Sequence, residues 1–225
     1  MKLKTIAHIR TDFPEKFGIP RQSGLVKDLY GTIIFEPEFR HPDILRGIQE
    51  FSHLWLLWQF SQNSRETWSA TVAPPRLGGK IRKGVFATRS SFRPNSVGLS
   101  SVKLEAVENS EKHGQILIVS GVDMLDNTPI FDIKPYLPYS DCHIDAKGGF
   151  GQDVLQHCLE VNIPNSLALL IESCDIQVIK EILSQDPRTA FIHDPKRIWG
   201  ISYKKYNIRF TVNDNLLTVC EITYL

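Results

Sequence analysis

Short runs of aliphatic and aromatic residues follow one another along most of this chain, and few of them have helical spacing. Residues 2–10 alternate polar and apolar side chains, as a strand with one buried face does. Residues 31–35 and 54–60 are rich in branched and aromatic side chains, which also favours strands. The same pattern predicts four further strands, at residues 84–88, 97–106, 115–122 and 129–133. Strands without regularly intervening helices predict a mainly β fold, an antiparallel barrel or sandwich, and argue against a doubly wound sheet.

One helix is expected among these strands. Residues 42–51 have helical spacing, with Ile44, Leu45 and Ile48 on one face and Pro42 near the start.

The composition changes at residues 140–152, which are rich in Asp, Gly, Ser and Lys and predict a loop or linker. Beyond it, residues 166–173 and 176–183 have the pattern of short helices, and strands are expected at 199–203, 206–212 and 216–224. A chain of 225 residues can form a main domain and a small second one. The predicted domains are a barrel at residues 1–139 and a small α+β domain at residues 153–225.

The cysteines and the N-terminus predict a cytoplasmic location. Four scattered cysteines without a C-x-x-C pair are typical of small buried apolar residues in a reducing compartment. Residues 1–10 lack the apolar core of a signal peptide, and residues 54–60 are too short to span a bilayer.

The familiar catalytic signatures are missing. The sequence contains no G-x-S-x-G, no phosphate-binding G-x-x-x-x-G-K-[ST], no H-E-x-x-H and no G-x-G-x-x-G. Its histidines never occur at metal-ligand spacing, so we expect no metal. A metalloenzyme or a standard hydrolase is therefore disfavoured.

Residues 67–104, the acid-free segment, contain no Asp or Glu although the whole chain carries a net charge of only +1. A solvated face usually mixes both signs of charge, so this segment predicts an anionic ligand. The alternative for each cation is a carboxylate partner elsewhere in the chain. Its basic residues are Arg76, Lys80, Arg82, Lys83, Arg89, Arg93 and Lys103.

A second basic zone lies near the C-terminus, and two such zones suit an extended polyanion such as RNA. Four aromatic residues among these cations are candidates for stacking on bases, with Trp199 and Tyr206 favoured instead as core. The cations are Arg188, Lys196, Arg197, Lys204, Lys205 and Arg209; the other two aromatics are Phe191 and Tyr203.

Acidic residues concentrate before and within the predicted strand at 129–133. Asp126 opens a D-N-T-P turn, in which short polar side chains bond the local backbone. Asp132, Lys134 and Tyr136 follow closely and are candidates to hold a substrate group or to accept a proton.

Several of these stretches together resemble the TsaA-like (YaeB) family. They are PRQSG at residues 20–24, PPRLGG at 74–79, GVFATRSSFRPN at 84–95, DNTP at 126–129, DIKPY at 132–136 and DPR at 186–188. The resemblance implies a β-barrel that binds S-adenosylmethionine without a Rossmann sheet. It further implies a homodimer that methylates N6 of threonylcarbamoyladenosine beside the anticodon of tRNA.

The resemblance also implies site residues. The family's cofactor contacts correspond here to Arg21, Gln22, Ser23, Ser61, Gln62, Arg89, Leu99, Asp123, Met124, Leu125 and Asp126. For the RNA substrate we expect contacts from Arg76, Arg82, Lys83, Arg93, Asn95 and Arg188.

This chain departs from the family pattern at three positions. Ser61 stands where relatives often have His, Ser96 where they usually have Pro, and Asn127 where Gly is usual. Asn visits left-handed backbone conformations, so we expect the turn to tolerate Asn127.

A sulfonium donor brings its own leaving group, so the protein mainly has to align the reactants. This explains why the familiar catalytic signatures are missing. Arg89 or Arg93 is expected to bind the threonyl carboxylate of the substrate. Two alternatives stay open: a non-catalytic RNA-binding module on the same barrel, and a methyltransferase for small molecules.

Overall fold

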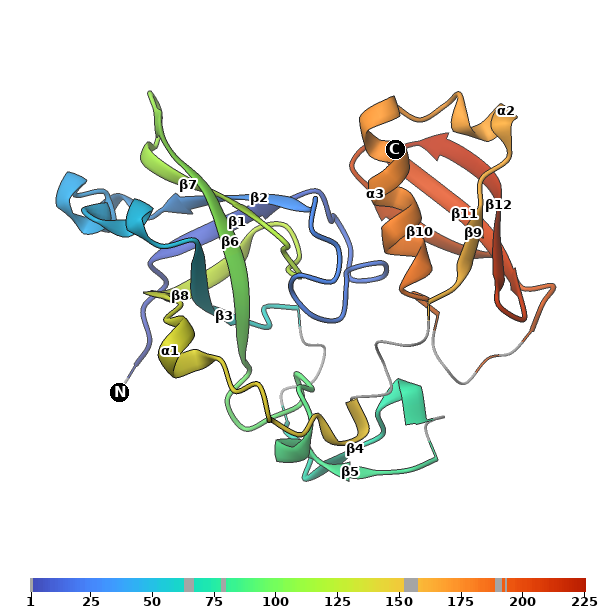
Figure 1. Cartoon of the computed structure of the whole chain (residues 1–225), viewed down its shortest axis with the longest axis horizontal. Coiled ribbons are helices and arrows are strands. Elements are labelled where there is room, and N and C mark those ends of the chain that lie inside the picture. Colours follow the sequence, from blue (N-terminus) through green and yellow to red (C-terminus); the bar gives the residue numbers. More distant parts are fainter. Residues whose placement is uncertain (1, 63–66, 78–79, 152–157, 189–191, 193) are drawn as a thin grey trace. The chain divides into compact units, whose positions relative to one another are not determined.

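The structure, a computed structural model, describes the chain except residues 1, 63–66, 78–79, 152–157, 189–191 and 193, and except the side chain of Arg76 (Figure 1). It forms two compact units. The first comprises Met1–Asp12 and Arg21–Cys142, and the second comprises Phe13–Pro20 and His143–Leu225. The chain thus leaves the first unit after twelve residues and returns to it at Arg21.

The first unit is built on a closed barrel. Among the described residues, six strands pair in the order β1-β2-β7-β6-β3-β8, every neighbouring pair being antiparallel. The predicted fold class is therefore confirmed, with strand ends shifted by a few residues. The strands are β1 (Ala7–Thr11), β2 (Tyr30–Phe35), β3 (His53–Gln59), β6 (Val97–Ser110), β7 (Gly114–Ser120) and β8 (Thr128–Pro135).

The barrel interior follows from the two-residue alternation along each strand. In β3, Leu54, Leu56 and Trp58 are buried, whereas the residues between them are more exposed. Trp58 packs on Gly98 of β6, where an added Cβ would lie 2.3 Å from the indole ring. Only glycine therefore fits opposite this tryptophan, and the close approach brings Trp58 next to Ser100.

Between β3 and β6 the chain forms a separate small lobe, the β4–β5 lobe, which comprises described residues 67–77 and 80–96. Its two-stranded sheet pairs β4 (Thr71–Val72) with β5 (Lys83–Gly84). The predicted strand at residues 84–88 is wrong, because after Gly84 the chain turns into a 3-10 helix at Val85–Ala87. A second 3-10 helix covers Pro75–Leu77.

The predicted helix at residues 42–51 is also wrong. The structure has two 3-10 turns there, Pro42–Leu45 and Ile48–Glu50, after a first one at Pro37–Phe39. Gly47 lies between the two turns with φ 85°, a left-handed conformation that ends a right-handed helix. The prediction that Ile44 and Leu45 share a buried face is correct only for Leu45, which is buried, because Ile44 is 48% exposed.

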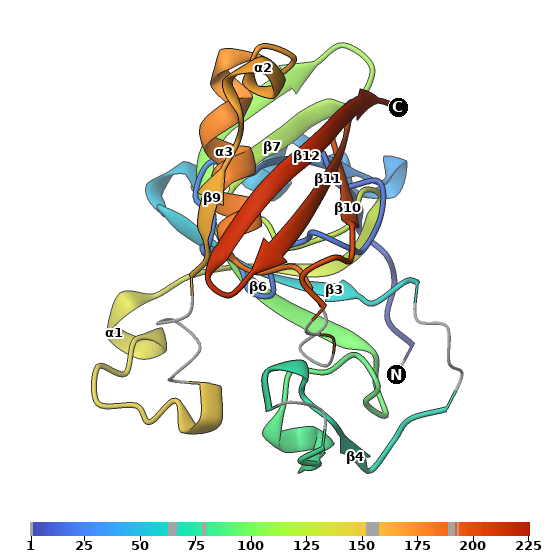
Figure 2. The ribbon, with the colours of Figure 1, turned by 90° about the vertical axis from the view of Figure 1, so that its right-hand side faces the viewer.

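The second unit is a four-stranded sheet with helices. Figure 2 is the view in which this sheet faces the reader. The strand order is β10-β11-β12-β9, with β10 (Trp199–Tyr203), β11 (Tyr206–Asn213), β12 (Leu216–Tyr224) and β9 (Glu160–Asn162). The short strand β9, parallel to β12, was not predicted. The helices α2 (Asn165–Ala168) and α3 (Ser173–Ser184) agree in type with the prediction, and α1 (Pro138–Asp141) ends the first unit.

The second unit buries one face of its sheet. Ile201, Ile208 and Phe210 are all fully buried, as are Ile179 and Leu183 of α3. The segment Phe13–Pro20 adds to this core: Phe13 packs on Tyr203 with ring centroids 5.5 Å apart, and Phe17 stacks on Trp199 at 6.1 Å.

All four cysteines, Cys142, Cys158, Cys174 and Cys220, are exposed, so the prediction that they are buried is wrong. Their spacing carries no information about exposure, because a single cysteine fits strand edges and turns as readily as a core. Among the described helices, none combines the length and hydropathy needed to cross a membrane.

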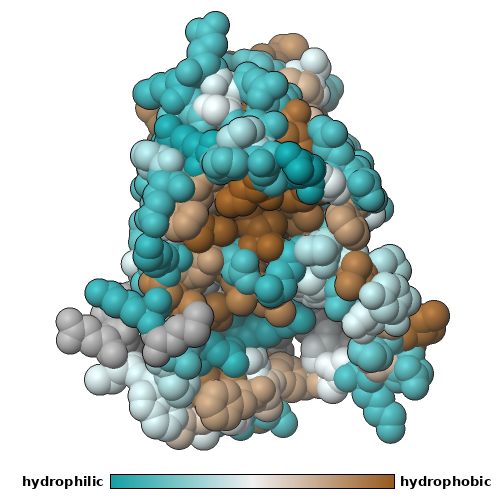
Figure 3. Space-filling view, turned by 90° about the vertical axis from the view of Figure 1, so that its left-hand side faces the viewer, coloured by the Kyte–Doolittle hydropathy of each residue, from teal (hydrophilic) through white to brown (hydrophobic). Residues whose placement is uncertain are grey.

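Figure 3 shows apolar side chains reaching the surface in a hollow framed by hydrophilic ones, on the side of the molecule where β2 and β7 lie. Apolar atoms contribute more than half of the surface of ordinary folded proteins. The hollow therefore assigns no function by itself.

Candidate active site

The candidate site is built where the chain returns to the first unit, against the turn that follows β7. Gly121 adopts φ 74°, and its carbonyl accepts a hydrogen bond from the Gly24 amide at 2.9 Å. An added Cβ at Gly121 would lie 3.3 Å from the Gly24 backbone. This close approach places the loop 21–24 beside the turn that carries Asp123.

Asp123 is the centre of the site. Its Oδ1 accepts a hydrogen bond of 2.7 Å from the Ser100 hydroxyl, which in turn accepts one of 2.9 Å from the Trp58 indole nitrogen. Burial raises the pKa of Asp123 from its ordinary value of 3.8 to about 6, while bonds from Ser100 and from the Ser23 backbone and the charge of Arg89 act in the opposite direction. A carboxylate whose pKa is raised by burial, and which is held by specific hydrogen bonds, is typical of functional sites.

Arg89 links the β4–β5 lobe to this centre. It lies just after the 3-10 helix Val85–Ala87, and its guanidinium donates a hydrogen bond to the side-chain oxygen of Gln22. The Gln22 amide nitrogen donates to the Arg21 carbonyl. Gln22, Ser23, Arg89 and Asp123 were all predicted cofactor contacts, and the structure brings them together from three distant segments.

Arg93 has a different place. Its Nη1 donates to the Thr88 carbonyl at 3.2 Å and to the Ser90 carbonyl at 3.4 Å, within its own loop. Arg93 therefore holds the loop that carries Arg89, and Arg89 is the better candidate to meet a ligand.

From the family resemblance we expect that replacing Arg93 by alanine lowers the binding of the implied cofactor and the implied methyl transfer together, by about tenfold, because a charged donor is lost and the Arg89 loop loosens. Titration calorimetry with S-adenosylmethionine and initial rates on tRNA measure the two losses. Lys112→Ala, which removes an exposed cation far along the sequence, is the control. A loss confined to methylation of carboxylate-bearing tRNA would instead assign Arg93 to the substrate.

Within the chain, the remaining residues of the predicted acidic stretch pack in the core or bond to β1, and their predicted cofactor contacts stay a prediction. Met124 and Leu125 are core residues, 1% and 9% exposed. Asp126 accepts hydrogen bonds from Arg10 at 2.8 Å and from the Thr11 amide at 3.0 Å, which ties the turn to β1. Asn127 has φ 61°, so the expected left-handed conformation is confirmed.

The predicted catalytic residues and Leu99 lie on the outer face of the barrel. Leu99 and Asp132 both pair with Leu57, one on each side of it, and Leu99 is 51% exposed. Asp132 forms an ion pair of 3.0 Å with Lys134. By the strand alternation, these side chains point away from the interior, into which Ser100 points.

Tyr136 follows β8 and packs on Trp55, with ring centroids 5.5 Å apart. Burial and the nearby Asp141 and Cys142 raise the pKa of the Tyr136 phenol above its ordinary value. A phenol of raised pKa stays protonated at neutral pH, which disfavours Tyr136 as a proton acceptor.

The other predicted site residues lie around the β4–β5 lobe. Ser61, Gln62 and Asn95 are exposed beside it, and Lys83 is half-buried. Arg82 donates to the hydroxyl of Thr71 at 2.8 Å and to its carbonyl at 2.6 Å, so it bridges β4 and β5. The side chain of Arg76 lies outside the described residues.

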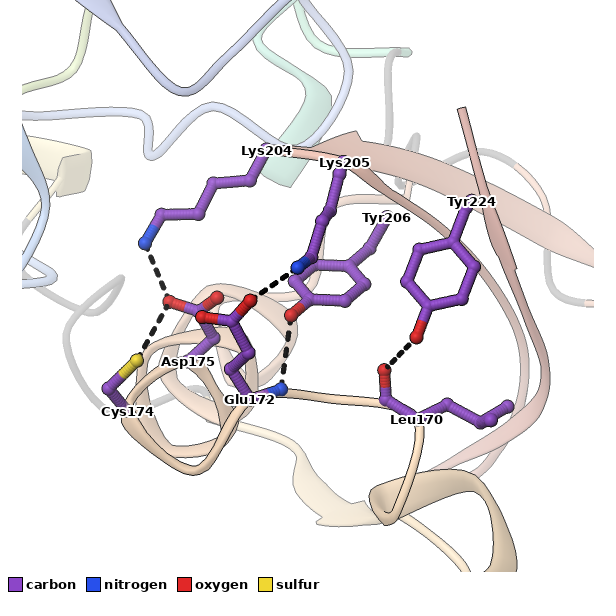
Figure 4. Close-up of polar contacts among 8 residues, drawn as sticks. All are labelled: Leu170, Glu172, Cys174, Asp175, Lys204, Lys205, Tyr206 and Tyr224. Atoms are coloured by element: carbon purple, nitrogen blue, oxygen red, sulfur yellow. Dashed lines mark hydrogen bonds and ion pairs between the residues drawn. The ribbon is translucent and has the colours of Figure 1, made fainter.

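The second basic zone is largely neutralised within its own unit, as Figure 4 shows around α3. Lys204 bonds Asp175 at 2.6 Å and Lys205 pairs with Glu172. Glu172, Cys174 and Asp175 have the donor atoms of a small metal cluster, yet the two ammonium groups already balance its carboxylates.

The same holds elsewhere in this zone. Arg209 pairs with Glu221 at 3.1 Å, and Arg188 pairs with Asp186 at 2.8 Å with its side chain only 10% exposed. We therefore assign Arg188 a structural role. The prediction that Arg188 contacts RNA is not supported by this burial.

The aromatic residues of the second basic zone that the structure describes are core. Trp199 and Tyr206 are 7% and 0% exposed, as favoured from the sequence, and Tyr203 at 2% is equally unavailable for stacking on bases. Phe191 lies outside the described residues.

Sequence reasoning missed Ser100 and Trp58. Ser100 is only 1% exposed, at an inward position of β6 between apolar residues. A polar residue at an inward position needs a hydrogen-bond partner, and this was the available signal.

Comparisons with known proteins agree with the geometry. The tRNA-methyltransferase O N-terminal domain matches residues 8–142, and the TrmO C-terminal domain matches residues 156–225. A tRNA (adenine(37)-N6)-methyltransferase of Escherichia coli K12 is 38% identical over 95% of this chain and 94% of its own length. A Pseudomonas aeruginosa protein named "Putative S-adenosylmethionine-dependent methyltransferase RcsF" is 38% identical over 87% of this chain and 86% of its own.

A solved structure is also similar over the whole chain. The crystal structure of TrmO from P. aeruginosa superposes with a TM-score of 0.80 at 33% identity, covering 100% of this chain and 97% of that one.

Proposed function

The chain belongs to the TrmO family of tRNA methyltransferases, and from this premise we propose that it transfers the methyl group of S-adenosylmethionine to N6 of threonylcarbamoyladenosine beside the anticodon. The family resemblance read from the sequence is confirmed by these matches. The modified base, the cofactor contacts and the residues that act on them are our proposal.

One observation carries the proposal for the site. Asp123 is fixed by Ser100 and by the loop 21–24, and the Arg89 charge reaches it from a third segment. These three segments therefore place a carboxylate near a guanidinium that is hydrogen-bonded to Gln22. No G-x-S-x-G serine or other activated nucleophile is needed for methyl transfer from a sulfonium.

The residues present fit S-adenosylmethionine. Its cationic and hydrogen-bond-donating groups match the Asp123 carboxylate, and its carboxylate matches the Arg89 guanidinium, a pairing that favours bidentate geometry. The Gln22 side chain adds an amide that both donates and accepts. We assign these three residues to the cofactor.

The bound cofactor would supply an activated methyl group with its own leaving group. The protein then has to hold the acceptor nitrogen in line with the methyl group and the sulfur. Alignment of reactants in this way lowers an activation barrier by roughly several kcal/mol. Trp58 and Ser100 act behind Asp123 by fixing the direction of its carboxylate.

The test uses the purified full chain with tRNA that carries threonylcarbamoyladenosine and with matched tRNA that carries plain adenosine. We expect a mass increase of one methyl group on the modified nucleoside only, and one cofactor site per chain by calorimetry. Cofactor binding with methylation of a small molecule alone would favour a different substrate. RNA binding without any cofactor site would favour the non-catalytic module.

We further propose a cytoplasmic location and a homodimer, as is expected from the family. Fractionation of cells and sedimentation of the purified chain test these two points.

A further inference from the structure

Large apolar side chains stand exposed on the β4–β5 lobe. Trp68 is 56% exposed, Ile81 is 52% exposed and Phe86 is 77% exposed. Burying a side chain of this size normally stabilises a fold, so exposing several in one small lobe is unfavourable unless they serve an interaction.

The lobe presents Phe86 on a fixed turn. The preceding residue Val85 is 2% exposed, and its amide donates to the Ala70 carbonyl at 3.0 Å. The Val85 carbonyl accepts from the Thr88 amide at 3.1 Å and from the Thr88 hydroxyl at 2.9 Å. Trp68 precedes Ser69, whose amide bonds the Phe92 carbonyl at 3.1 Å, so backbone hydrogen bonds lie next to both aromatic residues. A backbone fixed in this way loses little conformational freedom when its side chain binds a partner.

The lobe is also positively charged. It lies within the acid-free segment, which contains no Asp or Glu between residues 67 and 104. Among the described residues, the side-chain hydrogen bonds of Arg82 and Arg93 go to neutral oxygens of the lobe and not to carboxylates. Lys80 is exposed beside Ile81. This contrasts with the second unit, in which Arg188, Lys204 and Arg209 pair with carboxylates.

We propose that the β4–β5 lobe binds the unpaired nucleotides next to the target base, with Phe86 and Trp68 stacking on bases and Lys80 and Arg82 facing phosphates. Exposed aromatic rings between cations are what single-stranded RNA requires, because every base has a stacking face and every linkage has a charge. This inference rests on the proposed function, which it deepens by naming the surface that receives the RNA.

Continuity with the site supports RNA as the occupant. Phe86 lies three residues before Arg89, which bonds Gln22 beside Asp123. A base delivered to the Asp123 site therefore brings its neighbours towards Phe86. A second copy of the chain fits less well, because a two-fold interface on this lobe would set the acid-free segments of both copies against each other.

The test is the affinity for a 17-nucleotide anticodon stem-loop RNA, measured by fluorescence anisotropy on the full-length chain without cofactor. Phe86→Ala should weaken binding about fivefold or more, the effect expected for one stacked base. Phe86→Trp should retain affinity, and Phe86→Leu should not, because leucine keeps apolar area without a stacking ring. Tyr139→Ala is the matched control, since Tyr139 is an aromatic residue exposed to 87% on α1.

Three further measurements separate the possible failures. Sedimentation of Phe86→Ala should show the oligomeric state of the parent chain, and a changed state with unchanged RNA affinity would overturn the inference in favour of a protein interface. Circular dichroism checks that the lobe variants fold, and the double variant Lys80→Ala, Arg82→Ala should reduce the salt dependence of binding. Normal methylation with unchanged RNA affinity in Phe86→Ala refutes this surface alone, whereas a wild-type chain that methylates no tRNA refutes the proposed function.

Discussion

Replacing Asp123 by asparagine should weaken S-adenosylmethionine binding about ten- to a hundredfold and, at the same time, make the folded chain more stable at neutral pH. The first effect follows from the loss of a charged hydrogen-bond acceptor at the cofactor. The second follows from the burial that raises the pKa of Asp123 to about 6. A site residue that costs stability and is nevertheless present is a sign of function.

The sign of the stability effect follows from linkage. The folded-state pKa of Asp123, about 6, lies above its unfolded value near 3.8, so the folded chain binds more protons between these pH values. The contribution of this group to the free energy of unfolding therefore falls as the pH rises from about 4 to about 6 and stays lower above it. The difference between Asp123→Asn and wild type should grow from near zero at pH 4 to on the order of 1–3 kcal/mol above pH 7.

Urea unfolding at several pH values measures this difference, and calorimetry measures the cofactor affinity. For the wild type, affinity should fall as the pH drops through about 6, where the Asp123 carboxylate takes up a proton; for Asp123→Asn it should not change there. Ser100→Ala is the partner variant: it keeps the charge but loses the bond that directs it. Wild-type affinity in Asp123→Asn at neutral pH would remove this carboxylate from the site.

Replacing Arg89 by alanine should lower cofactor affinity at pH 7 by about tenfold or more and move the pH midpoint of binding upwards. The affinity loss reflects a missing charged hydrogen bond. The midpoint moves because the Arg89 charge lowers the pKa of Asp123, so that removing the charge raises this pKa further.

Calorimetric titrations from pH 5 to pH 8 give both quantities. Arg89→Lys should keep the midpoint near that of the wild type while it recovers only part of the affinity, because an ammonium lacks the fork of donors that reaches Gln22. Gln22→Ala removes the same contact without changing any charge and should leave the midpoint in place. A midpoint unaffected in Arg89→Ala would mean that the two side chains do not act as one site.

The sequence alone determined the fold class and the family. Period-two alternation along 31–35, 54–60 and 97–106 requires strands with one buried face, and the absence of helical spacing between them leaves antiparallel pairing as the simple solution. The stretch GVFATRSSFRPN at residues 84–95 identified the family because it is long and specific. The left-handed turn at Asn127 was predictable because only a few residue types adopt that conformation.

The local sequence pattern was insufficient to predict the structure where the backbone conformation of one residue or a partner from a distant segment determines it. Residues 42–51 have helical spacing, yet Gly47 at φ 85° divides them into two turns. Lys204 has no acidic neighbour in the sequence, but folding places Asp175 beside it. The short strand Glu160–Asn162 exists only because β12 offers it an edge.

The site itself was decided by tertiary structure. The sequence supplied Gln22, Arg89 and Asp123 as candidates, but it could not show that Asp123 accepts a hydrogen bond from Ser100, which is itself bonded to Trp58, nor that Asp126 bonds Arg10. The pKa of a carboxyl and the direction of a guanidinium depend on burial and on neighbours within a few ångströms, and those neighbours come from segments far apart in the chain. Sequence patterns report which face of a strand is buried, whereas only the closed barrel determines which polar groups meet there.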